Sequence, residues 1–389
     1  MATPANDSHS VASGGAVAAG RFTIPAWRLA MPNRTWAHLT GNTLGALDPK
    51  LDSLVNPNYP GDAPWKGVNG QESVISAWSG GAWDEATRSL YIHGGGHGDY
   101  AGNEVYKWSA LTGQFSRLNS PSGAIGNTGT LNDGNDATNP CYFDGKPRSA
   151  HTYGNLQFVN GEFWNFQGSN YSIGFGIRSA FKLVSNVWVR QTTKTWGASY
   201  GMTVWDSFRS RFLLISSGNG KPIWWKPGDD STGQMNYWTN NDAQEAFGVY
   251  DSRRDVVVQF SKYVTCFKCD DTADAVAITT TGSPPVWASY TAIGNPSRTG
   301  VVYDEVNDRY LVWGNGLSVY VLTPPIVGAN PLTATWVWSK IDPDAGNVIT
   351  PTAAAANGTY GRFWYSPYLK CCGVVNSTTE RMHVFALDY

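Results

Sequence analysis

The side chains best able to do chemistry gather in one part of the chain and comprise His93, His97, Asp99, Tyr100, His151 and Tyr153. Three of the 6 histidines of the protein belong to this group. A histidine base and a tyrosine acid, with an arginine such as Arg148 or Arg178, would suit β-elimination on a uronic acid. His93 and His97 with Asp99 would alternatively supply the ligands of a divalent metal ion.

A structural role is the simpler interpretation of the same group. Glycine-rich loops such as Gly94-Gly95-Gly96 contain backbone groups that need hydrogen-bond partners, and His, Asp and Asn usually supply them. We therefore favour structural capping, for Asn103 and Glu104 above all, and predict no catalytic residue and no metal site. The alternative catalytic set is His93, His97, His151 and Tyr153.

Two aromatic dipeptides form a second candidate site, on either side of an acidic turn. Aromatic faces stack on pyranose rings, so this stretch is a candidate sugar-binding platform, although such residues also pack between sheets. The candidate binding residues are Trp224, Trp225, Tyr237 and Trp238.

The 5 cysteines do not form a recognisable disulfide or metal framework. Cys266 and Cys269 have the spacing of a metal or redox pair, but no second such pair exists. Cys371 and Cys372 are adjacent, and on one strand they would point to opposite faces. We expect buried free thiols and no cofactor.

Composition excludes several kinds of partner. The chain has 28 Lys and Arg against 30 Asp and Glu, so no basic field is available for specific nucleic-acid binding. No stretch approaches the about 20 apolar residues of a membrane span, so we expect no membrane insertion. The opening residues MATPANDSHSVASGGAVAAG lack the basic and apolar regions of a secretory signal, which predicts synthesis in a cytoplasm.

The elements that must position these residues follow from a repeat. An aromatic-Asp pair, a short polar turn and a strand recur as Trp83-Asp84, Trp205-Asp206, Tyr250-Asp251 and Tyr303-Asp304. A degenerate copy is Tyr365-Ser366, and a further unit surrounds LQFVNGEFWNFQG. The pattern predicts a hairpin in which Asp caps the turn, and the spacing of about 45 to 60 residues is typical of propeller blades.

The repeat predicts an all-β fold, a β-propeller of six blades, with seven as the alternative. The blades fall near residues 72–120, 148–192, 199–240, 244–282, 296–342 and 357–389. The last has three evident strands, so Thr35–Leu39 is predicted to supply the fourth and close the ring. Residues 35–389 would form the propeller and residues 1–34 an extended N-terminal arm.

Two segments carry a family resemblance. The double-glycine strand end and polar loop of residues 91–106, followed by Arg148–Gly154, resemble the kelch and galactose-oxidase-like propellers. The copper-binding arrangement of galactose oxidase has no counterpart here. The phrase IPAWRLAMPNRTW, with the segment Gly95–Val105, is similar to uncharacterised propeller proteins of tailed bacteriophages.

The second resemblance implies a structural component of a virion, in a tail, a nozzle or a head attachment. Its partners would be other virion proteins and copies of itself, bound through the N-terminal arm, together with a host surface glycan. The alternative function is a glycan-binding or polysaccharide-lyase-like propeller. We expect the chain to be more a binding or assembly protein than an enzyme, and to be located in the virion.

Overall fold

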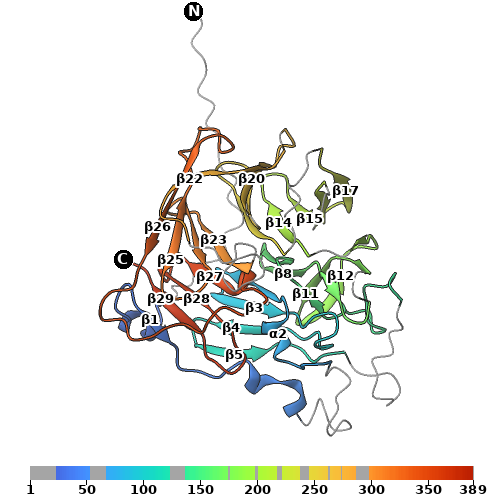
Figure 1. The fold of residues 1–389 in the computed structure, drawn as a ribbon. Coiled ribbons are helices and arrows are strands. Elements are labelled where there is room, and N and C mark those ends of the chain that lie inside the picture. The colour runs from blue at the N-terminus through green and yellow to red at the C-terminus, as the bar shows by residue number, and fades with distance from the viewer. Residues whose placement is uncertain are drawn as a thin grey trace, which may run out of the picture.

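Six β-sheets are arranged in a ring in the computed structural model (Figure 1). The structure describes residues 23–52, 67–122, 136–173, 176–197, 200–216, 221–236, 245–261, 263–272, 274–285 and 298–388. The first strand of each sheet contacts its counterparts in the order β2, β7, β14, β18, β23, β27 and back to β2. The predicted six-bladed propeller is confirmed.

Blades 1 to 3 are four-stranded antiparallel sheets. Blade 1 contains β2 (Gly80–Asp84), β3 (Ser89–His93), β4 (Tyr106–Ser109) and β5 (Gln114–Arg117). Blade 2 contains β7 (Leu156–Val159), β8 (Glu162–Asn165), β11 (Phe181–Val184) and β12 (Val187–Arg190). Blade 3 contains β14 (Met202–Asp206), β15 (Arg211–Ile215), β16 (Ile223–Lys226) and β17 (Ser231–Gln234).

Blades 4 to 6 follow the same plan, except that blade 5 has a fifth strand and blade 6 takes its fourth strand from the N-terminal end of the chain. Blade 4 contains β18 (Phe247–Asp251), β19 (Val256–Phe260), β20 (Val264–Lys268) and β21 (Val276–Ala277). Blade 5 contains β23 (Gly300–Asp304), β24 (Arg309–Trp313), β25 (Val319–Thr323) and β26 (Thr335–Ile341), and β22 (Thr279–Gly282) pairs in parallel with β26. Blade 6 contains β27 (Phe363–Ser366), β28 (Cys371–Val374) and β29 (His383–Ala386), together with β1 (Trp36–His38).

Short elements join or cover the blades. Two small sheets pair β6 (Ala150–His151) with β9 (Ser169–Asn170), and β10 (Ile177–Arg178) with β13 (Trp196–Gly197). The helices are α1 (Ala26–Ala30), α2 (Ser73–Ser76), η1 (Gly45–Leu47), η2 (Pro49–Leu51) and η5 (Tyr360–Arg362).

The ring closes where the two ends of the chain meet. Strand β1, in blue, lies beside β29, in red, and the pairing runs from Trp36 opposite Phe385 to His38 opposite His383 (Figure 1). The predicted closing strand is therefore confirmed. Every other blade is continuous in sequence, so this pairing protects the one seam of the ring.

The segment just before the closing strand also packs on the ring. Arg28 in α1 is fully buried and donates hydrogen bonds to the carbonyls of Leu369, Lys370 and Leu387. The indole of Trp27 donates to the carbonyl of Ala110 in blade 1. Of the predicted arm, residues 23–34 thus contact blades 6 and 1, and residues 1–22 lie outside the described residues.

The repeated turn has the predicted cap. The side chain of Asp206 accepts from the backbone of Arg209, and Asp251 accepts from Arg253 and Arg254. In five blades, the fourth residue after this aspartate, or after Ser366 in blade 6, has a left-handed backbone with positive φ. These residues are Arg88, Ser210, Asp255, Asp308 and Lys370. Blade 2 instead joins its first two strands through Asn160-Gly161, both with positive φ, which is the two-residue hairpin typical of Asn-Gly. This shorter turn explains why blade 2 lacks the aromatic-Asp motif.

The hydrophobic core lies between neighbouring blades. Trp83 of blade 1 stacks on Trp364 of blade 6 with ring centroids 4.3 Å apart. Tyr91 of blade 1 stacks on Phe163 of blade 2 and meets Phe158 of the same blade at a tilt. Aromatic side chains of neighbouring blades therefore pack against each other where the blades meet.

Candidate ligand site at the channel mouth

The innermost strands of the six blades surround a central channel, and we call the end at which these strands begin the loop end. Six side chains converge at this end. Each lies two or three residues before the first strand of a different blade. This mouth ring consists of Trp78, Tyr153, Tyr200, Glu245, Arg298 and Tyr360.

The backbone of the mouth ring is unusual. Trp78, Tyr153, Glu245 and Tyr360 have φ of 47°, 46°, 57° and 47°, which large side chains rarely adopt. Backbone strain of this kind costs on the order of 1–3 kcal/mol per residue and clusters at functional sites. A small residue follows each of the four, and a Cβ added to Gly361 would lie 1.9 Å from the carbonyl oxygen of Gly81.

Contacts within the mouth ring cross this end of the channel. The indole Nε1 of Trp78 donates to Glu245 Oε1 over 2.9 Å, and this bond links blade 1 to blade 4 on the opposite side of the ring. Arg298 Nε donates to the other oxygen of Glu245 over 2.7 Å. The ring of Tyr153 contacts the rings of Tyr200 and Tyr360 edge to face, with centroids 5.4 and 6.0 Å apart.

The predicted histidine group partly assembles beside the mouth ring. His151 Nε2 lies 3.0 Å from Asp99 Oδ2, and its Nδ1 lies 3.5 Å from the hydroxyl of Tyr153. The His151 ring packs between Trp78 and the exposed His97, each 4.7 Å away between centroids. The structure therefore brings together His97, Asp99, His151 and Tyr153.

His93 is separated from that group. It is fully buried between blades 1 and 2, where its Nδ1 lies 3.0 Å from the carbonyl oxygen of Glu104 and its ring contacts Trp188. Asn103 accepts from the backbone of Ser122 and donates to the carbonyl of Pro147, as structural capping predicts. Tyr100 and Tyr106 both donate to Glu104 Oε1, so Tyr100 also serves the interior.

Burial favours the neutral forms of His151 and His93. It lowers the pKa of His151 to about 4, against the opposing effect of Asp99, and it lowers the pKa of His93 to about 4. The pKa of Tyr153 is raised by burial and by the nearby Tyr360 and Glu245. At neutral pH the imidazole of His151 is neutral and Tyr153 keeps its proton. A neutral imidazole that donates to Asp99 through Nε2 accepts from the tyrosine hydroxyl through Nδ1.

The arginines considered for catalysis have structural partners. Arg148 is buried and its Nε donates to the carbonyl of Asn139. Arg178 is buried and donates to Gly197 O and to the side chain of Asn155. Arg298 is the arginine that the structure places in the mouth ring, and no motif in the sequence marks it.

The second predicted site is divided by the structure. Trp225 is fully buried and donates to Asp230 Oδ1, so its ring has no face free to stack on a sugar. Trp224 is half-buried beside Arg211 and Lys226. Tyr237 and Trp238 lie outside the described residues.

The five cysteines are free and buried, as predicted, and burial raises the pKa of the thiols of Cys266 and Cys269. Within the described part of the chain, no three His, Cys, Asp or Glu side chains are grouped so that they would hold a metal ion. The proposed metal set of His93, His97 and Asp99 is split because His93 points into the core.

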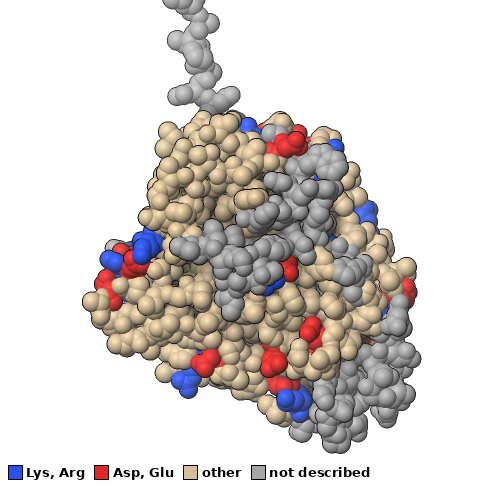
Figure 2. Space-filling model, viewed as in Figure 1, with Lys and Arg blue, Asp and Glu red and all other residues tan. Residues whose placement is uncertain are grey.

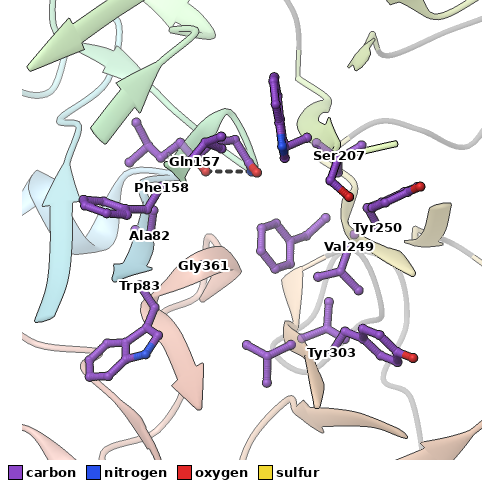
Figure 3. A pocket seen from close by; sticks show the side chains of 18 of the residues that line it. Ala82, Trp83, Gln157, Phe158, Ser207, Val249, Tyr250, Tyr303 and Gly361 are labelled. Atoms are coloured by element: carbon purple, nitrogen blue, oxygen red, sulfur yellow. Dashed lines mark hydrogen bonds between the residues drawn. The ribbon is translucent and has the colours of Figure 1, made fainter. Parts of the chain in front are cut away.

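Below the mouth ring the channel contains a cavity of about 570 Å³ that reaches the turn end, where Ser207, Ser252 and Glu305 are exposed (Figure 3). Its walls are the unpaired edges of the six innermost strands. In Figure 3 the rings of Trp83, Phe158, Tyr250 and Tyr303 radiate away from its centre. The cavity is lined by backbone groups and by apolar side chains such as Phe247, Val249 and Phe363, whereas the mouth ring combines aromatic, acidic and basic side chains.

Charged side chains are scattered on the surface. On the face shown in Figure 2, acidic and basic side chains occur in small groups separated by wide uncharged areas. The described residues include no helix of the length and apolar character needed to cross a membrane.

The fold and the site define a six-bladed β-propeller with a side-chain cluster at one end of its channel. No protein-family model and no curated protein sequence matches the chain. Among solved structures it is similar to the major allergen Mala s 1 of Malassezia sympodialis, at 9% identity and a TM-score of 0.48, over 84% of this chain and 96% of the allergen. It is also similar to an auxiliary nutrient binding protein of Bacteroides ovatus, at 10% identity and a TM-score of 0.43, over 84% of this chain and 70% of that protein.

Proposed function

We propose that this protein binds a glycan at the loop end of the channel. The observation that carries the proposal is the mouth ring, in which all six blades direct a large side chain to one point through a strained or glycine-flanked backbone. If the mouth ring only capped the channel, smaller residues could do so without backbone strain. Strain at equivalent positions of several blades therefore supports a further role for these large side chains.

The exposed groups of the mouth suit a sugar. Tyr200 and Trp78 are partly exposed aromatic rings, and His97 is exposed beside them. Aromatic faces bind the apolar faces of pyranose rings. The Asp99 carboxylate can accept hydrogen bonds from sugar hydroxyls, and a tyrosine hydroxyl can both donate to them and accept from them.

Binding is a better match than cleavage for His151. Its side chain is 3% exposed, and both nitrogens already face Asp99 and Tyr153. A general base must reach the proton that it abstracts, and this ring is covered by Trp78 and His97. The lyase chemistry expected as an alternative is therefore the less favoured form of the proposal.

Calorimetric titration with a panel of oligosaccharides tests the proposal. The variants Tyr200→Ala and His97→Ala should each weaken binding about tenfold, which corresponds to ~1.4 kcal/mol. The control is Phe208→Ala, because Phe208 is 79% exposed on a turn at the other end of the channel. Absence of binding to every glycan would reject the proposal, and release of unsaturated products would replace binding by lyase activity.

We also propose that the protein is an assembly component of a bacteriophage virion, as the resemblance in the sequence implies. The docking of α1 supports this role, because Arg28 fixes the chain to blade 6 and so gives residues 1–22 a defined starting point on the ring. A host surface glycan at the channel mouth would be compatible with it.

Removing residues 1–22 tests the assembly role without touching the described contacts. The truncated chain should fold but should be absent from particles purified from cells that carry the phage or prophage encoding it, as measured by mass spectrometry. Equal incorporation of the truncated and full chains would contradict a role for the arm. Absence of the full chain from the particles would contradict the virion assignment.

A further inference from the structure

The last residue pair of the strand that closes the ring consists of two histidines. His38 of β1 lies opposite His383 of β29, and their rings stack with centroids 4.1 Å apart and an angle of 24° between their planes. The next pair is hydrogen-bonded, because the amide of Leu39 donates to the carbonyl of Met382 over 3.1 Å. The two histidines therefore occupy a non-hydrogen-bonded position, where opposing side chains lie closest.

One carboxylate faces this histidine pair. His38 Nε2 lies 3.3 Å from Glu380 Oε2, and both of these side chains are partly exposed. His383, in contrast, is only 3% exposed. A positive charge on His38 is therefore balanced by Glu380 and by water. A second charge, on His383, would be buried against the charged ring of His38.

The neighbouring elements leave this charge balance unchanged. Arg381, which follows Glu380 in the chain, is exposed. On β28, burial raises the pKa of the Cys372 thiol, so this thiol stays uncharged. Residues 314–318 and 347–356, which contact Trp36 of the closing strand, contain no ionisable side chain. The charge state of the seam is therefore set by the two histidines and Glu380.

We infer that the seam is an acid-sensitive latch, in which β1 is released from β29 when the stacked histidine pair takes up a second proton. Two protonated rings at this distance repel each other, and separation of the strands relieves the repulsion. Burial and, to a smaller extent, His38 lower the pKa of His383 to about 4 from its ordinary 6.5. The open seam binds a proton that the closed seam excludes, so closure is complete above about pH 6.5 and weakens as the pH falls toward 4.

Hydrogen exchange of backbone amides, measured by mass spectrometry and corrected for the intrinsic exchange rate, tests the latch. Between about pH 7.5 and about pH 5 the protection of residues 36–39 should fall roughly 30-fold, as the lowered pKa of His383 requires. In His383→Gln this fall should be largely lost, whatever the absolute protection. In Glu380→Gln it should become larger, because His38 then carries its charge without a partner.

His93→Asn is the matched control, because His93 is also a buried histidine with a pKa lowered to about 4, but it lies between blades 1 and 2. This variant should keep the pH response of the seam. An equal loss of the response in His93→Asn and His383→Gln would overturn the latch, because exchange would then follow unfolding of the whole ring. Constant protection of the wild-type seam across this pH range would also overturn it, as would a smaller fall in Glu380→Gln than in the wild type.

Discussion

Gly96 lies beside the contact between the side chains of His151 and Asp99. Its φ is +94°, and a Cβ built on it would lie 2.3 Å from His151 Nε2 and 2.6 Å from Asp99 Oδ2. The space that a side chain would occupy is already filled by this pair. Glycine at this position is therefore a requirement of the site as well as of the loop.

Replacing Gly96 with alanine should break the contact between Asp99 and His151. We expect a loss of about 1–3 kcal/mol in the free energy of unfolding, from the left-handed backbone and the clash together. The ring signals of His151 in NMR spectra should shift. Gly98→Ala is the matched control in the same loop, because a Cβ there meets no atom within 4 Å. If both variants behave alike, the loop tolerates side chains and the clash argument is wrong.

His93 should make the stability of the protein depend on pH. Burial lowers its pKa to about 4, from an ordinary value near 6.5. Between these values the unfolded chain binds a proton that the folded chain excludes, so stability is complete above about pH 6.5 and falls as the pH drops to 4. The full effect of this one group is about 3 kcal/mol.

Denaturant titrations between about pH 4 and 7 can isolate this contribution. In His93→Asn the free energy of unfolding should change less steeply with pH than in the wild type, whatever its absolute value. Other buried groups contribute equally to both proteins, so the difference in slope reports His93 alone. Parallel curves for the two proteins would show that His93 is protonated as easily in the folded state as in the unfolded state.

At the scale of the elements, the repeated turn also joins neighbouring blades. Arg254 lies three residues after Asp251 and binds it, and it extends to Asp308 in blade 5 with Nη2 and Oδ2 2.6 Å apart. Arg209 repeats the arrangement with Asp206 and with Asp255 of blade 4. An arginine three residues after the cap therefore reaches the left-handed residue of the next turn.

Arg254→Ala should lower the free energy of unfolding by about 3 kcal/mol, because it leaves the fully buried Asp251 without its charged partner. Arg253→Ala is a control at the adjacent position, where the side chain is 40% exposed and lies 3.8 Å from Asp308. The expected loss there is about 0.5 kcal/mol, as for exposed ion pairs. Thermal and denaturant unfolding of the two variants measures the difference, and similar losses would refute the role of the inter-blade clamp.

The sequence predicts the blades because the aromatic-Asp turn repeats its chemistry as well as its shape. It does not predict the mouth ring, because equivalent positions there carry Trp, Tyr, Glu or Arg and share only their backbone. The available signal was a large residue followed within two positions by glycine, as in Trp78-Ser-Gly80, Tyr200-Gly201 and Tyr360-Gly361. His93 and His97 are neighbours in sequence, yet one faces the core and the other solvent, and spacing alone could not separate them.

At the scale of the whole molecule, stability depends on closing the ring. The seam is held by β1 against β29, by the indole of Trp36 donating to Leu317 O in blade 5, and by Arg28 in blade 6. These contacts tie the first described residues to the last two blades. Without them β29 would become an exposed edge strand, which favours association with other chains.

Removal of residues 1–38 should therefore prevent the chain from remaining a folded monomer. It takes away β1 and α1 together, exposes the edge of β29 and leaves the carbonyls around Arg28 without a donor. Light scattering and denaturant unfolding should show aggregates or a marginally stable ring with reduced cooperativity. The chain lacking only residues 1–22 is the control, because it retains every contact described for the seam. A monomeric 39–389 fragment with wild-type stability would show that the five complete blades and three strands of blade 6 suffice, and that the N-terminal strand serves another purpose.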